Sequence, residues 1–148
     1  MSEDCVFCKI VAGELPAARV YEDTDTLAFL DIGPVVKGHT LVVPKQHFDP
    51  ITGTPPDVLQ KLIVTVQRVA RAQFSALKAE GVNVSQANGK VAGQIVPHVH
   101  FHVIPRFSQD GHSRNWSPRT YDSDAEMNNF ADRIRGAMAK NGGGGGHA

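Results

Sequence analysis

The sequence predicts an α+β fold: an antiparallel meander sheet of about five strands, with one long helix packed on it and a second helix at the C-terminus. Five short runs rich in aromatic or β-branched residues are separated by acidic residues, glycine or proline, which is typical of antiparallel strands. Between the third and fourth runs lies a long stretch with apolar residues at helical spacing, and a similar stretch comes near the end of the chain. This order of elements favours helices packed against a single sheet.

The first half of the chain is expected to contain one short helical turn, three strands and the long helix. Residues 7–12 form the turn, which Gly13 stops, and the strands cover 18–23, 26–32 and 39–45. Thr54 and Pro55 open the long helix and Gly81 closes it. Its expected apolar face consists of Leu59, Leu62, Ile63, Val66, Val69, Ala70, Phe74 and Leu77.

The second half is expected to supply two strands, over 82–88 and 96–105, joined by the glycine-bearing loop 89–95. The last helix spans 124–140 and starts with a Ser123/Glu126 capping box. We expect residues 1–140 to form a single domain and 141–148 a flexible Gly-rich tail. The apolar face of the last helix consists of Met127, Phe130, Ala131, Ile134 and Met138.

Composition narrows the classes of partner. The 148 residues carry 15 basic and 15 acidic side chains, so no global field steers the chain toward nucleic acid or an anionic membrane. There is no run of about 18 apolar residues and no signal-peptide pattern at the N-terminus, so we expect no membrane partner and a cytoplasmic location. Cys5 and Cys8 are the only cysteines, and their spacing suits a metal clip better than a structural disulfide.

The segment "HVHFHV" places three histidines at alternate positions. In a strand, His98, His100 and His102 would share one face while the intervening apolar residues point into the core. The outer two α-carbons would then lie about 13 Å apart, too far for one zinc to bind all three rings at about 2 Å. At least one imidazole is therefore free for other chemistry, and a merely His-rich solvent-facing strand is the alternative interpretation.

Together with Asp31, His39 and the upstream "NGKVAGQIVP", this pattern closely resembles the histidine triad (HIT) family, in particular its Hint-like branch of nucleotide phosphoramidases and hydrolases. The resemblance extends from "CVFCKIVAGELPA" through "LAFLDIGPVVKGHTLVVPKQH" to the triad. It implies a HIT-like fold and a covalent mechanism. His100 would attack the α-phosphorus of a purine nucleotide conjugate, His102 would contact the phosphate and help protonate the leaving group, and His39 would complete the cluster. Neutral imidazole is a competent nucleophile near pH 7.

The resemblance also implies a binding site. Asp31 would accept hydrogen bonds from the ribose hydroxyls, and Phe7, Ile10, Phe29 and Ile32 would form an apolar slot for the base, with plain core packing as the alternative. Asn88, Gly93 and Gln94 match the segment that contacts phosphate, although Asn88 also suits a turn. Ile95 departs from the family, which often has a hydroxyl side chain there; isoleucine donates no hydrogen bond, which favours an ester or anhydride over an amine leaving group.

For the cysteines, the resemblance implies a structural zinc site that Cys5 and Cys8 share with His47 and His98, making His98 an anchor of the triad strand. A redox pair is the competing interpretation, although no thioredoxin-like context follows the cysteines. A homodimer is implied chiefly by the resemblance. Arg106 is expected to neutralise a nearby carboxylate or phosphate, or to be solvated. Two alternatives to the covalent enzyme are a zinc-dependent hydrolase and a nucleotide- or partner-binding module with incidental catalysis.

Overall fold

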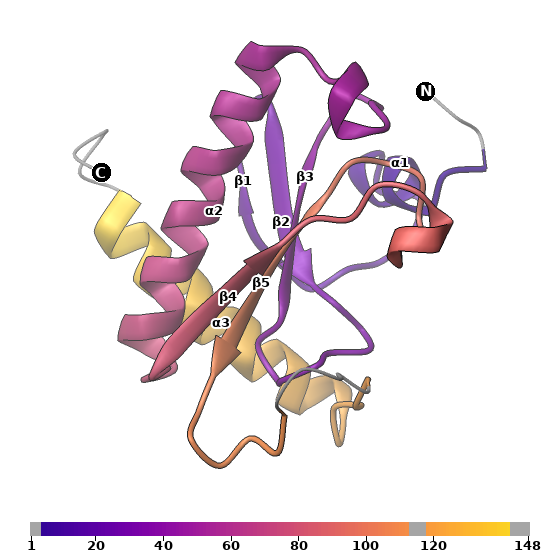
Figure 1. Cartoon of the computed structure of the whole chain (residues 1–148). Coiled ribbons are helices and arrows are strands. Elements are labelled where there is room, and N and C mark those ends of the chain that lie inside the picture. Colours follow the sequence, from indigo (N-terminus) through magenta and orange to yellow (C-terminus); the bar gives the residue numbers. More distant parts are fainter. Residues whose placement is uncertain (1–3, 113–117, 143–148) are drawn as a thin grey trace.

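The computed structural model describes residues 4–112 and 118–142 and confirms the α+β fold. Five strands form one antiparallel sheet in the order β1-β2-β3-β5-β4 (Figure 1). The first three follow one another as a meander, whereas β5 pairs with β3 and leaves β4 at the edge. The strands are β1 (Arg19–Glu22), β2 (Thr26–Leu30), β3 (Thr40–Pro44), β4 (Gly81–Ser85) and β5 (Phe101–Arg106).

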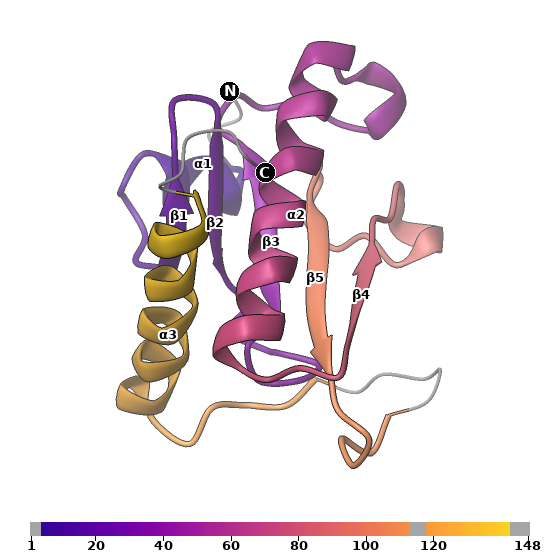
Figure 2. The same ribbon diagram turned by 90° about the vertical axis from the view of Figure 1, so that its left-hand side faces the viewer.

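The helices lie on both faces of this sheet. Figure 2 shows α2 and α3 side by side in front of it, with α1 behind. The helices are α1 (Val6–Val11), α2 (Pro56–Ala76) and α3 (Asp124–Gly142), and two 3₁₀ turns are η1 (Ile51–Gly53) and η2 (Lys90–Ala92). In the described residues no helix combines the length and the apolar character needed to span a bilayer. Of the predicted tail 141–148, residues 143–148 lie outside the described residues.

The two central strands are buried along their whole length because both sheet faces are covered. In β2, Ala28 and Leu30 pack under α2 and α3, whereas Leu27 and Phe29 pack under α1. Alternate side chains of a strand point to opposite faces. The side chains beneath α1 form part of the site described below.

The expected apolar face of α2 is wrong in two places. Ile63 and Phe74 are about half exposed, while Thr65 and Gln73 are buried in the core. The hydroxyl of Thr65 hydrogen bonds to that of Thr26 at 2.9 Å, and Gln73 Nε2 donates to two backbone carbonyls, whereas Oε1 of Gln73 has no hydrogen-bond partner among the described residues. A satisfied polar group can be buried at little cost, and spacing alone does not reveal such partners.

Two element ends differ most from the prediction. Gly81 does not close α2, which ends at Ala76, and the chain turns at Lys78 in a left-handed conformation with φ of 58°. The fifth strand begins at Phe101 instead of residue 96, because Val99 N–H donates to the carbonyl of Phe48 at 2.8 Å and not to a neighbouring strand. His98 and His100 therefore lie on the segment that leads into β5.

At the start of α3 the predicted capping box forms in a modified way. The hydroxyl of Ser123 accepts a hydrogen bond from the Glu126 N–H at 3.0 Å, as expected. The carboxylate of Glu126 accepts from the N–H of Asp122 at 2.8 Å, one residue before the expected donor.

Candidate active site

His100 has one ring nitrogen with a free lone pair. Its side chain is buried, and Nδ1 lies 2.7 Å from the carbonyl oxygen of His98. A carbonyl only accepts hydrogen bonds, so Nδ1 carries the proton and the neutral ring keeps a lone pair on Nε2. The ring lines a cavity of about 490 Å³, and Phe7 packs edge-on against it with ring centroids 5.0 Å apart.

A chain of hydrogen bonds fixes the tautomers of His39 and His102. The N–H of Val35 donates to Nδ1 of His39 at 3.1 Å, so neutral His39 carries its proton on Nε2. That nitrogen lies 2.9 Å from Nδ1 of His102, which must accept. Neutral His102 therefore carries its proton on Nε2, where it can donate to a ligand in the cavity that His102 also lines.

Burial keeps these imidazoles neutral. Desolvation, together with a smaller effect of neighbouring imidazoles, lowers the pKa of His39 to about 3 and that of His102 to about 4. Burial also lowers the pKa of His100, against the opposing effects of the His98 carbonyl and of Asp31 and Asp49. All three rings are accordingly neutral at pH 7, the form in which imidazole is nucleophilic.

Asp31 lies at the end of β2, where the chain turns into the loop that leads to His39. One carboxylate oxygen accepts the N–H of Gly33 at 2.8 Å, while the other lies 3.8 Å from Nε2 of His39. Burial raises the pKa of Asp31, with the Gly33 hydrogen bond and His100 acting in the opposite direction. Asp31 lines the cavity, where its carboxylate can accept hydrogen bonds from a diol.

The four apolar residues predicted to contact the base all line the same cavity. Phe7, Ile10 and Phe29 are buried and also belong to the core beneath α1, so packing and site lining are compatible roles for them. Ile32 is 79% exposed and contributes little to the core. The sequence interpretation did not identify the remaining apolar lining residues, which no motif marks: Val6, Leu15, Pro16, Ala17, Leu30, Leu41 and Val96.

The loop from 88 to 95 divides into two groups of side chains. Gly93 and Ile95 line the cavity. Gln94 is buried, with Nε2 donating to Asp49 at 2.7 Å and Oε1 accepting from the N–H of Gly89 at 2.7 Å. The side-chain oxygen of Asn88 accepts from the N–H of Ile51 at 2.8 Å. In this structure the two amides hold the loop in place, and Asp49, which no sequence motif marks, takes part.

Cys5, Cys8, His47 and His98 come together, although they are far apart in the sequence. Their ligand atoms all lie within 4.8 Å of one another. Sulfur to Nδ1 distances are 3.3 Å for Cys5 to His98, 3.3 Å for Cys8 to His47 and 3.6 Å for Cys8 to His98. A tetrahedral zinc with Zn–S near 2.3 Å and Zn–N near 2.1 Å separates sulfur from nitrogen by about 3.6 Å. These residues therefore fit a zinc ion.

The tautomer of His98 also fits metal binding. Its Nε2 donates to the carbonyl of Pro44 at 2.9 Å, which leaves the Nδ1 lone pair directed at the sulfurs. A hydrogen bond of this kind on the remote nitrogen is usual for a histidine that ligates a metal.

A second group, formed by Asp31, His39 and His102, also has its ligand atoms within 4.8 Å of one another. Its hydrogen bonding disfavours a metal. Because Nδ1 of His39 accepts from Val35, a metal on Nε2 would move the ring proton to Nδ1, against the Val35 N–H. The zinc-dependent hydrolase interpretation therefore has less support than covalent catalysis.

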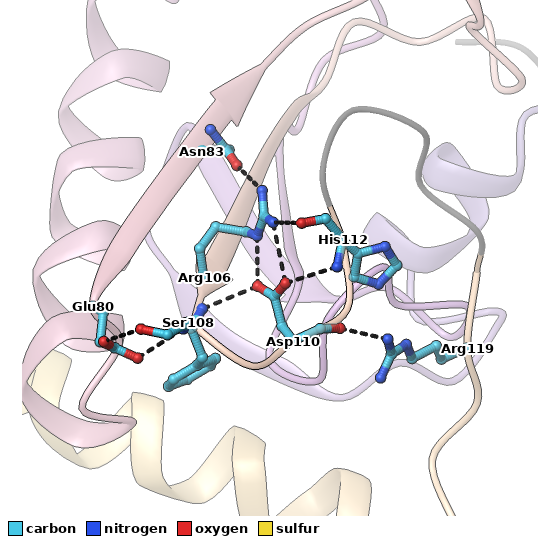
Figure 3. Close-up of polar contacts among 8 residues, drawn as sticks. Glu80, Asn83, Arg106, Ser108, Asp110, His112 and Arg119 are labelled. Carbon is cyan, nitrogen blue, oxygen red and sulfur yellow. Dashed lines mark hydrogen bonds and ion pairs between the residues drawn. The ribbon is translucent and has the colours of Figure 1, made fainter.

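Arg106 pairs with a carboxylate at the end of β5. Its Nε lies 2.7 Å from Asp110, whose carboxylate also accepts the N–H groups of Phe107 and His112 (Figure 3). Further along the chain, the guanidinium of Arg119 donates to the carbonyl of Asp110, and its backbone N–H donates to the carbonyl of Pro34 at 2.7 Å. The network therefore connects the chain after β5 to the loop that follows Asp31.

Comparison with known proteins points in the same direction as this geometry. A family model described as the HIT domain matches residues 12–109. An uncharacterized HIT-like protein of Methanocaldococcus jannaschii is 51% identical over 107 residues, covering 72% of this chain and 82% of that protein. Adenosine 5'-monophosphoramidase HNT1 of Candida albicans is 33% identical over 141 residues, 92% of each protein. The crystal structure of a Zn-bound histidine triad family protein from Mycobacterium smegmatis superposes with a TM-score of 0.86 at 39% identity, covering 95% of this chain and 97% of that one.

Proposed function

The chain belongs to the HIT-domain family, and from that premise we propose that it is a nucleotidyl hydrolase or transferase that acts at the α-phosphate of purine nucleoside phosphoramidates or related conjugates. The observation that carries the proposal is the tautomer of His100, which presents an unprotonated Nε2 to the cavity. In the same cavity, Asp31 provides a hydrogen-bond acceptor for the ribose, and the apolar wall provides a surface for the base. The family relationship to a protein named as a monophosphoramidase supports this assignment.

In the first step, Nε2 of His100 forms a bond to phosphorus while the bond from phosphorus to the leaving group breaks. The phosphoryl anion favours the protonated form of His102, whose Nε2–H then gives its proton to the departing group. Protonated His102 also carries a proton on Nδ1, so His39 then takes the tautomer with its proton on Nδ1, gives up the hydrogen bond from Val35, and accepts on Nε2 across the 2.9 Å contact that orients His102. The displacement yields a nucleotidyl-imidazole and a neutral leaving group.

In the second step, water attacks the same phosphorus and the P–N bond to His100 breaks. The water proton passes to His102, and the nucleoside monophosphate leaves. The two displacements replace one difficult step by two easier ones. With another acceptor in place of water, the same intermediate supports nucleotidyl transfer.

Intact-protein mass spectrometry tests the covalent route. Wild-type protein is mixed briefly with an adenosine phosphoramidate and quenched in alkaline denaturant, and we expect a transient adenylyl adduct. His100→Asn should form neither adduct nor product but should still bind AMP in calorimetry. Turnover by His100→Asn would refute the nucleophile assignment, and AMP binding without adduct or product in wild type would favour the binding module.

We propose that zinc is a structural component held by Cys5, Cys8, His47 and His98, since their donor set and spacing fit it. When bound, the ion would cross-link the N-terminal segment to the segment that leads into β5 and so help to position the triad. The Zn-bound neighbour supports this proposal. Native mass spectrometry should show one zinc per chain.

We also propose a homodimer, formed through apolar side chains that α2 and β4 leave partly exposed. Ile63, Phe74 and Val84 are each about half exposed. Sedimentation equilibrium should give twice the chain mass, and a monomer at micromolar concentration would contradict this.

The cytoplasmic location stays a prediction, with which the two free thiols are compatible.

A further inference from the structure

The cavity has an apolar edge beside the catalytic histidines that the protein's own packing does not use. Ile95 is 89% exposed and lines the cavity together with His100 and His102. Val91, on the adjacent turn η2, is also fully exposed. Large apolar side chains left open at a binding site gain free energy when a ligand covers them.

The charges of the cavity select against an anionic leaving group. Among its described lining residues, Asp31 is the charged side chain, and neither lysine nor arginine is present. His100 and His102 are neutral in the ligand-free protein, and the one proton that His102 takes up with the phosphoryl anion is given to the departing group. Lys90 lies on the neighbouring turn but does not line the cavity. A departing pyrophosphate or sulfate would meet no cation of the described lining and would be repelled by Asp31.

The parts of the substrate can be assigned in turn. Under the proposed function, the wall beneath α1 takes the base, Asp31 takes the ribose and His100 takes the phosphorus. The lining that remains is Gly93, Ile95 and Val96, on the segment that leads to His100, and Ile95 is its exposed large side chain. Here the protein offers contact area but no side-chain hydrogen bond, because isoleucine has neither donor nor acceptor in its side chain.

We propose that Ile95 receives an uncharged apolar leaving group. The substrates would then be nucleoside 5'-monophosphates joined through nitrogen or oxygen to an apolar group, and not nucleoside polyphosphates or sulfates. This replaces the sequence expectation that isoleucine at position 95 favours an ester or anhydride over an amine. This inference rests on the proposed function. The P–N or P–O bond to that group breaks as the bond from His100 to phosphorus forms, and the apolar amine or alcohol departs with the proton from His102.

A series of AMP phosphoramidates made with methylamine, butylamine and hexylamine tests the proposal, because these amines differ little in basicity and hence in leaving ability. We expect kcat/KM to rise about tenfold or more from the methyl to the hexyl compound, because each added methylene group gains apolar contact in the pocket. The phosphoramidate of 6-aminohexanoate matches the hexyl compound in length and carries a terminal charge. It should lose most of the gain. An AMP ester of hexanol reports whether oxygen-linked groups are also accepted.

Variants at position 95 assign the effect to this side chain. Ile95→Ser should flatten the dependence on chain length, whereas Ile95→Leu, which keeps an apolar surface, should preserve it. Equal kcat/KM across the wild-type series, or a preference for the carboxylate, would overturn the inference while leaving the proposed function intact. A chain-length dependence unchanged in Ile95→Ser would overturn the role of Ile95. Absence of adduct and turnover with every compound would instead refute the proposed function.

Discussion

Replacement of His39 by glutamine should change how the free energy of unfolding depends on pH. In the folded protein burial holds the pKa of His39 near 3, whereas an exposed histidine in the unfolded chain titrates near pH 6.5. Below pH 6.5 the unfolded chain therefore binds a proton that the folded protein does not. The contribution of His39 to the free energy of unfolding is fully present above pH 6.5 and is lost as the pH falls toward 3.

The magnitude follows from these two values. The free energy of unfolding falls by about 1.4 kcal/mol per pH unit once the unfolded imidazole is protonated. Integrated from pH 8 to pH 5, the contribution of His39 amounts to about 2 kcal/mol. Its side chain is almost fully buried, so solvent screening does not reduce this value.

Urea denaturation followed by far-UV circular dichroism at pH 8, 6 and 5 measures the effect. Glutamine can still donate to Nδ1 of His102, and at pH 8 the difference between the two proteins reports the pH-independent cost of the substitution. We expect wild type to lose about 2 kcal/mol more than His39→Gln between pH 8 and pH 5. The ionisable groups other than His39 are present in both proteins, so their contributions cancel in the comparison. Parallel curves would refute the buried, neutral state of His39.

Three further predictions concern the stability of the fold, the ribose contact and the zinc site. Gly38→Ala should destabilise the protein by about 2 kcal/mol or more, measured by urea denaturation, because its φ is +101° and a Cβ would lie 2.6 Å from Leu77 Cδ1; a change below about 0.5 kcal/mol would contradict this. Asp31→Asn should raise KM for an AMP conjugate about tenfold through weaker ribose contacts, and a deoxyribose analogue should reduce the difference from wild type. Zinc removal by a chelator should lower Tm in wild type but not in Cys8→Ser, and equal shifts would argue against this site.

Much of the fold could be predicted from local pattern. The strands β2 and β3 and the helix α3 lie where the expected runs and spacing place them, because the side chains that specify them are neighbours in the sequence. The errors have a common origin. Gln73 lies in the core since it donates to the carbonyls of Gly38 and Val103, and β5 starts late since Val99 bonds to Phe48. Such partners are distant along the chain and leave no periodic signal.

The predicted site divides in the same way. The motifs and the family resemblance that they carry were enough to nominate His39, His100, His102, Asp31 and the four candidate zinc ligands, and the structure brings each group together. Asp49 carries no motif and could not be found. Its role appears only when the buried amide of Gln94 is seen to donate to it.

The sequence by itself determined the elements, their order and the kinds of chemistry available, because propensity and alternation act between near neighbours. Only the tertiary structure decided which nitrogen of each histidine holds the proton and how far burial lowers its pKa. Those properties depend on contacts such as Val35 to His39, His39 to His102 and Cys5 to His98. Desolvation and hydrogen-bond direction arise from groups that the fold brings together, 93 positions apart for Cys5 and His98.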